Sequence, residues 1–236
     1  MRLAPGYYRA WVELHIEQGP ILEREGVDIG VVEKIAAPAG YRFVIDGFGG
    51  HAGALLMPDR RDALCAAAEL VLAIEREARG TGAIDTVATV GMCDVFPGAV
   101  NSVPSRVTLS LDIRDTDPER RGGVMRRVRE EIGRIESERG VAVREEMVNE
   151  DQPATCAGEV VAAIEASCAD AGASLKRMVS RAYHDSLFIA QIAQIAMIFI
   201  PCRNGVSHRP DEYASPAAIA LGTRVLALTL ARLASL

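Results

Sequence analysis

The order of the elements expected in residues 35–148 limits the fold more than any other feature of this sequence. Runs of β-branched and apolar residues predict strands at residues 41–46, 86–95, 106–114 and 141–147, with a bend at 36–40. Apolar residues at helical spacing predict one helix from about Pro58 to Gly80 and another opened by Asp117-Pro118-Glu119. The resulting order, β-α-β-β-α-β, is that of a small ferredoxin-like α+β sandwich, and we expect it to be an inserted domain.

The flanking residues, 1–34 and 149–236, show a different pattern. Strands expected near residues 11–16, 29–35, 175–179 and 196–200 alternate with helices at 158–171, after Asp185 and at 215–233. Such alternation predicts an α/β domain with a partly parallel sheet. These residues are few for a sheet covered on both faces, so we expect a partial domain, the C-terminal portion of a larger one.

Composition excludes several classes of protein. The chain has 236 residues, 49% of them hydrophobic, which is ample for a buried core. A net charge of −6 gives no basic surface for a nucleic-acid partner. No apolar run is expected to span a membrane and residues 1–6 lack a signal-peptide core, so the prediction is a cytoplasmic protein without a membrane partner. Five cysteines without a C-x-x-C pair argue against a disulfide framework or a zinc knuckle.

The segment Glu13-Leu14-His15-Ile16-Glu17-Gln18-Gly19-Pro20 predicts a strand end that carries polar groups. Side chains alternate along a strand, so His15 and Glu17 share a face, and Gln18 points to the other face or turns with the chain. A lone histidine at a strand end is more often structural. However, all four histidines, which are His15, His51, His184 and His208, lie in segments where loops are expected, and loops commonly carry binding groups.

Several short motifs extend this pattern along the chain. In chain order, they are the segment from Glu13 to Pro20, Gly50-His51-Ala52-Gly53, Asn101-Ser102-Val103-Pro104, Leu111-Asp112-Ile113-Arg114-Asp115, His184-Asp185-Ser186 and Ser207-His208-Arg209-Pro210-Asp211-Glu212. Together they resemble the dinuclear-metal amidohydrolases that comprise N-carbamoyl-L-amino acid hydrolases, allantoate amidohydrolases and ureidoglycolate amidohydrolases. Residues 180–188 and Ile200-Pro201-Cys202 are most similar to the ureidoglycolate enzymes. The resemblance implies a partial α/β catalytic domain (1–34 and 149–236) with an inserted α+β ferredoxin-like lid and dimerisation domain (35–148).

The resemblance also implies a metal centre. His15 resembles a ligand to one of two divalent ions and His208 a ligand to the other, with manganese the first expectation and zinc the alternative. Two such ions activate a bridging water and hold the substrate oxygen. The family's remaining ligands and its general base lie in an N-terminal part that nothing here matches. We therefore expect this chain alone to bind divalent metal poorly and to hydrolyse no ureido acid.

Substrate contacts are implied in the same way. Gln18, Asn101 and Arg114 resemble substrate-binding residues, the last two holding a carboxylate. His51 resembles the lid histidine that reaches a partner subunit's site and steadies the oxyanion, and His184 a catalytic-site histidine that contacts the substrate.

Each of these residues also has a structural interpretation. Arg114 could form a surface ion pair with a neighbouring aspartate, and Asn101 could shape a turn. Asp185 could cap a helix, and His51 could be a conformational residue of a glycine-rich loop. Glu17 could orient His15 or be a simple strand-end carboxylate.

The implied activity is metal-dependent hydrolysis of a ureido C–N bond, first of ureidoglycolate to glyoxylate, carbon dioxide and ammonia in purine and allantoin degradation. N-carbamoyl-L-amino acids and allantoate are alternative substrates with the same scissile group. A second alternative is an inactive, truncated chain that acts as a dimerising module. The expected assembly is a homodimer formed through the inserted domain.

Overall fold

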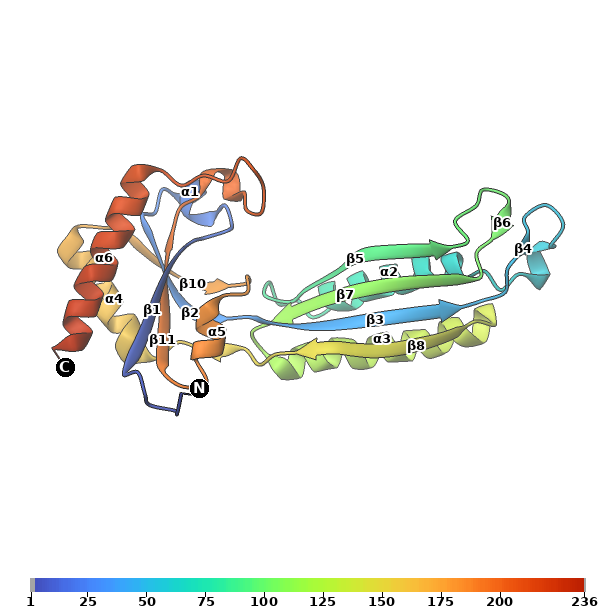
Figure 1. The fold of residues 1–236 in the computed structure, drawn as a ribbon, viewed down its shortest axis with the longest axis horizontal. Helices are drawn as coiled ribbons and strands as arrows, with labels where there is room; N and C mark the ends of the chain where they lie inside the picture. The colour runs from blue at the N-terminus through green and yellow to red at the C-terminus, as the bar shows by residue number, and fades with distance from the viewer. Residues whose placement is uncertain (1–2, 236) are drawn as a thin grey trace. The chain divides into compact units, whose positions relative to one another are not determined.

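The computed structural model describes residues 3–235, which form two compact units. Unit 1 contains the described residues up to Ala36 and from Pro153 onward, and unit 2 is Ala37–Gln152. The boundaries between the units therefore fall at 36/37 and 152/153, whereas the sequence predicts them at 34/35 and 148/149. Each unit has a sheet of its own (Figure 1).

Unit 1 is built on a mixed sheet. Its strands are β1 (Ala10–Ile16), β2 (Ile29–Ile35), β9 (Ala154–Thr155), β10 (Leu175–Ser180) and β11 (Gln194–Ile200). The strand order is β1-β11-β2-β10, with β9 paired to β2. β1 is parallel to β11 and β2 is parallel to β10, while β11 and β2 are antiparallel. The expected partly parallel sheet is thus present.

The helices of unit 1 are α1 (Ile21–Glu25), α4 (Gly158–Ala171), α5 (Asp185–Ile189) and α6 (Pro216–Ala234), with a 3-10 turn η2 (Arg203–Gly205). α6 packs against α4, β1 and β11. Gly222 of α6 lies so close to the side chains of Leu14 and Ile200 that an added Cβ would clash with them. Leu14 therefore faces α6, and strand alternation turns Glu13 and His15 to the other face of the sheet.

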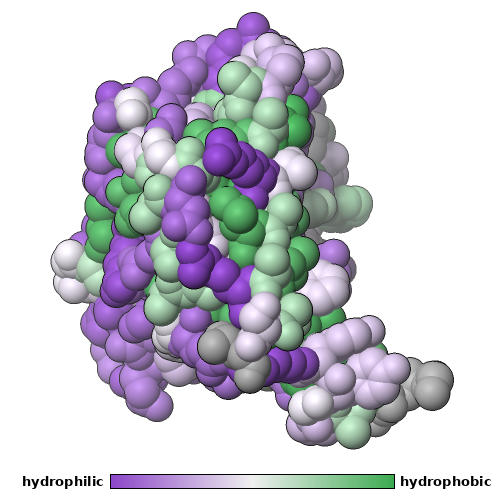
Figure 2. Space-filling model, turned by 90° about the vertical axis from the view of Figure 1, so that its left-hand side faces the viewer, coloured by the Kyte–Doolittle hydropathy of each residue, from purple (hydrophilic) through white to green (hydrophobic). Residues whose placement is uncertain are grey.

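α6 also bears on the expectation about membranes. By length and composition it could cross a membrane, with a mean hydropathy of 1.5 and 22% of its residues buried. The prediction that no apolar segment reaches this length is therefore wrong. A helix that packs on a sheet, as α6 does, can pass the same test. Figure 2 shows this side of unit 1, where hydrophobic side chains lie among hydrophilic ones.

Unit 2 follows the expected order of elements. Its main elements are, in chain order, β3 (Ala37–Asp46), α2 (Ala63–Arg79), β5 (Val87–Phe96), β7 (Arg106–Asp115), α3 (Pro118–Arg139) and β8 (Ala142–Glu150). The sheet order is β5-β7-β3-β8 and all neighbours are antiparallel. α2 and α3 pack on each other and on this sheet over a single apolar core. Val124, Val128 and Ile132 of α3 lie in that core, as their helical spacing predicted.

Two boundaries in unit 2 differ from the sequence-based expectation. The expected bend at 36–40 is strand: β3 begins at Ala37, and Pro38 pairs with Arg114 of β7. The Pro38 carbonyl accepts from the Asp151 amide beyond the β8 ladder, so the missing N–H of Pro38 costs no ladder bond. Pro58 lies in a separate 3-10 turn, η1 (Met57–Asp59), and α2 begins later because Asp62 caps it.

Candidate active site

His15 lies near the end of β1 on the sheet face opposite α6. Its Nδ1 is 2.9 Å from the Ile16 carbonyl oxygen, and a ring that carries one proton and donates this bond has the proton on Nδ1 and leaves the Nε2 lone pair free. This tautomer is the one that a metal-binding histidine needs when it binds through Nε2. His15 is half-buried, and its neighbour in the β1–β11 register is Phe199.

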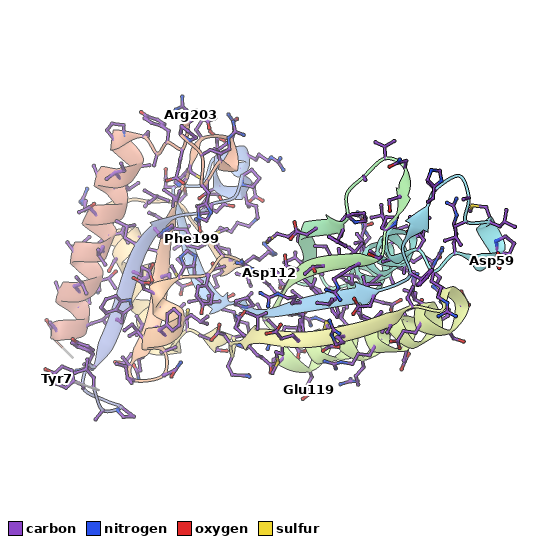
Figure 3. All side chains as sticks on the ribbon, turned by 45° about the vertical axis from the view of Figure 1, so that its right-hand side comes forward. Tyr7, Asp59, Asp112, Glu119, Phe199 and Arg203 are labelled. Carbon is purple, nitrogen blue, oxygen red and sulfur yellow. The ribbon has the colours of Figure 1, made fainter. Side chains whose placement is uncertain are left out.

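His184 joins His15 on this face of unit 1. Its ring packs edge-on against the His15 ring at 4.7 Å between centroids and tilts against Phe199 at 5.5 Å. Figure 3 labels Phe199 within the unit 1 sheet. The His184 side chain is buried, and its Nε2 has no hydrogen-bond partner. Burial, with a smaller contribution from His15, lowers the His184 pKa to about 4, so the imidazole is neutral at pH 7.

A chain of hydrogen bonds connects the end of β1 to the His208 loop. Gln18 Nε2 donates to Ser207 Oγ at 2.8 Å, and Ser207 Oγ donates to Glu212 at 2.9 Å. The same carboxylate oxygen accepts from the His208 backbone amide at 3.1 Å. These bonds lower the Glu212 pKa. Gln18 and His208 both have left-handed backbone conformations, with φ of 55° and 58°, which the connected loops hold in place.

Glu17 is a strand-end carboxylate with a structural role, and its hydrogen bonds go to the turn after β1. Its carboxylate is buried and accepts from the Ile21 and Leu22 amides, each at 2.8 Å. These N–H groups lie at the start of α1, where they have no partner within the helix. The N-cap residue, Pro20, makes no side-chain hydrogen bond to them. Glu17 therefore fixes the turn after β1, and the carboxylate that reaches toward the site histidines is Glu13.

The expected metal centre can be compared with the donor groups that are present. His15 fits a ligand role because its Nε2 is free, and the exposed His208 lies on the loop joined to the end of β1. Among residues 3–235, no group of three or more His, Cys, Asp or Glu side chains is placed to hold a metal ion. The two imidazoles thus fit part of a ligand set, and the described residues do not complete it.

His51 and Asn101 lie together at one end of unit 2. The two-residue strands β4 (Gly50–His51) and β6 (Ser102–Val103) pair, and the Ala52 amide donates to the Asn101 carbonyl at 2.8 Å. His51 is exposed, and its Nδ1 accepts from the Gly53 amide at 3.1 Å. The glycine-rich loop that carries His51 therefore includes a short antiparallel strand pair.

Arg114 lies at the opposite end of unit 2. β7 begins at Arg106, close after β6, and Arg114 is eight residues further along, about 27 Å at strand spacing. Figure 3 shows Asp112 far from Asp59, which lies in the loop region next to β4. Arg114 forms a two-pronged ion pair with Asp112, at 2.8 and 3.0 Å. Within one chain, Arg114 and Asn101 therefore cannot hold the same carboxylate.

The whole-chain comparison identifies the family. The model of Peptidase family M20/M25/M40 matches residues 3–232. The chain belongs to this family. The family resemblance inferred from the motifs is thus confirmed, as is the α/β architecture with a mixed sheet.

Individual relatives place the chain more narrowly within the M20/M25/M40 family. The ureidoglycolate hydrolase of Oryza sativa subsp. japonica is 52% identical over 96% of this chain and 47% of its own length. The N-carbamoyl-L-amino acid amidohydrolase of Geobacillus stearothermophilus is 41% identical over 98% of this chain and 56% of its own. The crystal structure of AtUAH in complex with glyoxylate superposes with a TM-score of 0.92 at 50% identity, over 98% of this chain and 55% of that one. The chain thus spans about half the length of these relatives.

Sequence reasoning overlooked three residues of this site. Glu13 stands two residues before His15, so strand alternation alone places both on one face. Ser186 is the second residue of α5, which begins at Asp185 directly after His184, and its hydroxyl donates to Glu13. Glu212 follows His208 by four residues, a spacing that a turn can close, but only the structure shows its bond back to the His208 amide.

Proposed function

We propose that this chain is part of a metal-dependent amidohydrolase that cleaves the ureido C–N bond of ureidoglycolate to give glyoxylate, carbon dioxide and ammonia. The observation that carries the proposal is the 52% identity to a ureidoglycolate hydrolase over nearly the whole chain. The similarity to AtUAH, whose structure contains glyoxylate, supports the same substrate class. We further propose that the protein acts in the cytoplasm and that its reaction is a step of purine breakdown.

The residues of unit 1 have distinct parts in the proposed reaction. His15 and His208 would each hold one of two divalent ions, manganese first and zinc as the alternative. When bound, such ions supply Lewis acidity and lower the pKa of a water. Gln18, fixed through Ser207 to the His208 loop, would orient the substrate. His184, buried and neutral, would form a hydrogen bond with the substrate without adding charge.

The residues of unit 2 imply a site shared between two chains. His51 and Asn101 lie at one end of this unit and Arg114 at the other. A substrate carboxylate contacted by both Asn101 and Arg114 would therefore need residues from two chains. We propose that unit 2 is a lid and dimerisation domain that carries His51 and Asn101 to a partner's site, where His51 would stabilise the oxyanion.

The first prediction tests the substrate. The full-length gene product, loaded with manganese, should release glyoxylate and ammonia from ureidoglycolate with a kcat/KM at least about tenfold above that for N-carbamoyl-L-amino acids or allantoate. A tenfold preference needs about 1.4 kcal/mol of differential transition-state binding, which one substrate hydrogen bond can supply. Enzyme-coupled glyoxylate and ammonia assays over this panel measure it. A preference for a carbamoyl amino acid would make the protein a sister enzyme with the same chemistry. Full metal loading without turnover of any ureido acid would refute the proposed activity.

The second prediction tests the assembly. We expect a homodimer at micromolar concentration, because a two-chain site requires that each chain supply His51 and Asn101 to the other. Sedimentation velocity of the 236-residue chain measures the association, since unit 2 is a compact unit with its own core. Only monomer at this concentration would contradict the shared site. A further check uses the full-length protein, in which mixing inactive His51→Ala chains with inactive His15→Ala chains should restore part of the activity only if the sites are shared.

A further inference from the structure

The carboxylate of Glu13 holds the start of α5 in place beside the site histidines. Its Oε2 accepts two hydrogen bonds from Ser186, from the backbone amide at 2.9 Å and from Oγ at 2.6 Å. Its Oε1 lies 3.8 Å from Nδ1 of His184. Glu13 is therefore hydrogen-bonded through one carboxylate oxygen to Ser186, two residues after His184. Its other carboxylate oxygen lies near the His184 ring. No step proposed above gives this residue a role.

The packing around His184 leaves the ring little freedom. Glu13 and His15 project from the same face of β1, and the His184 ring lies against His15, at 4.7 Å between centroids, and against Phe199, at 5.5 Å. Phe199 is the register neighbour of His15 on β11, so both contacts come from the sheet. The ring position is thus set by the sheet and by the anchored start of α5.

The facing oxygen distinguishes the two neutral forms of His184. With the proton on Nδ1, the positive hydrogen is carried by the ring nitrogen that lies 3.8 Å from the Glu13 carboxylate. With the proton on Nε2, the Nδ1 lone pair would face the same negative oxygen, which is repulsive. Nε2 is buried and has no partner, and a buried polar atom without a partner in a folded protein calls for an explanation. In the first form Nε2 is an acceptor that a ligand could satisfy.

We propose that Glu13 is a positioning residue that keeps His184 in the tautomer protonated on Nδ1, so that Nε2 accepts a hydrogen bond from an N–H or O–H group of the bound ureido acid. The identity of the ligand rests on the proposed function, and the tautomer does not. Ser186 contributes by holding the Glu13 carboxylate through two bonds, one of which comes from the backbone and survives replacement of its side chain. Glu13→Gln would keep the size of this group and remove the charge that selects the tautomer.

The decisive measurement is nuclear magnetic resonance of the 236-residue protein with isotope-labelled histidine. The chain has only four histidines, so the spectrum contains few signals. The two ring-nitrogen signals that disappear in His184→Gln belong to His184. The ring nitrogen and Cδ2 shifts should show the proton on Nδ1 at pH 7. Glu13→Gln should give a mixture of tautomers, Ser186→Ala should keep most of the wild-type form, and Glu33→Gln, on β2 and paired with Arg177, should change nothing.

The outcomes separate this inference from the proposed function. Protonation on Nε2 in the wild type, or an unchanged tautomer in a folded Glu13→Gln variant, would overturn the role of Glu13 whatever the enzyme hydrolyses. If Glu13→Gln does not fold, a loss of the Nδ1–H signal in Glu13→Asp, whose carboxylate is held one carbon further back, supports the same role. In the full-length enzyme, Glu13→Gln should lower kcat/KM for ureidoglycolate by about 10–100-fold, because a histidine in the wrong tautomer cannot make its hydrogen bond. An unchanged kcat/KM would refute the role of Nε2.

Discussion

Replacing His208 or His15 with alanine in the full-length, manganese-loaded protein is expected to lower ureidoglycolate turnover by about a thousandfold. In the proposed function each imidazole would hold one of two ions, and a bound ion contributes several kcal/mol of charge stabilisation in the transition state. A loss of about 4 kcal/mol corresponds to about 10³ in rate. The metal content should fall from about two ions per chain to about one, since the remaining ligands of the affected ion hold it weakly.

A neighbouring residue provides the matched control for this prediction. Arg209 follows His208 in the same exposed loop and pairs only at the surface with Asp211, at 2.9 Å. Exposed pairs of this kind contribute little to stability, so Arg209→Ala should keep nearly full turnover and metal content. Turnover is measured by glyoxylate release and metal by elemental analysis of the dialysed protein. If either histidine variant kept near wild-type turnover and metal content, that histidine would not be a metal ligand.

The fold was most predictable where local patterns are strong. α4 begins and ends where its apolar spacing placed it, because Gly172 takes the left-handed conformation that ends the helix. β2 likewise covers the predicted residues 29–35, a segment rich in β-branched residues. The start of β3 differs from the expected bend because Pro38 and Gly40 favour turns, whereas pairing with β7, and with β8 from Ala39 onward, makes this segment a strand.

The site could be predicted only in part, because its contacts join distant segments. Strand alternation places His15 on one face of β1, but nothing near it predicts that His184 will pack against its ring. The bond from Gln18 to Ser207 joins residues 189 positions apart. Family motifs named these residues without giving their geometry. The structure adds this geometry: Glu17 caps α1, and Arg114 lies far from Asn101 in the same chain.

Two aspartates of β7, each paired with an arginine, allow a buried ion pair to be compared with an exposed one. Asp115 is fully buried and accepts from Arg120 Nε at 2.9 Å, from Thr86 Oγ1 at 2.6 Å and from the Asp117 amide at 2.9 Å. Asp112, three residues earlier, projects from the other face of the sheet, where its side chain is 48% exposed beside Arg114. The two sites differ mainly in burial and in the number of bonds to the carboxylate.

We therefore expect Asp115→Asn to destabilise unit 2 by about 3 kcal/mol and Asp112→Asn by less than about 1 kcal/mol. Neutralising Asp115 leaves the Arg120 guanidinium beside an amide, and breaking a buried charged pair costs about 3–5 kcal/mol, the lower end applying here because Arg120 is 30% exposed. The surface pair is worth little because water screens it. Hydrogen exchange of the β7 amides reports on unit 2, and fluorescence of the single tryptophan, Trp11 in β1, reports on unit 1. Equal effects on β7 exchange would contradict the assignment.

The pH dependence gives an independent test of the same interaction. Burial acts to raise the Asp115 pKa, but the hydrogen bonds from Arg120 and Thr86 outweigh it and hold the pKa below its ordinary value of 3.8. A carboxylate whose pKa is lower in the folded than in the unfolded state adds stability above the unfolded pKa and loses it as the pH falls through the folded one. The stability difference between wild type and Asp115→Asn should therefore be constant above about pH 5 and shrink below about pH 4. A difference that persists undiminished well below this range would show that the variant acts through packing and not through the charge of Asp115.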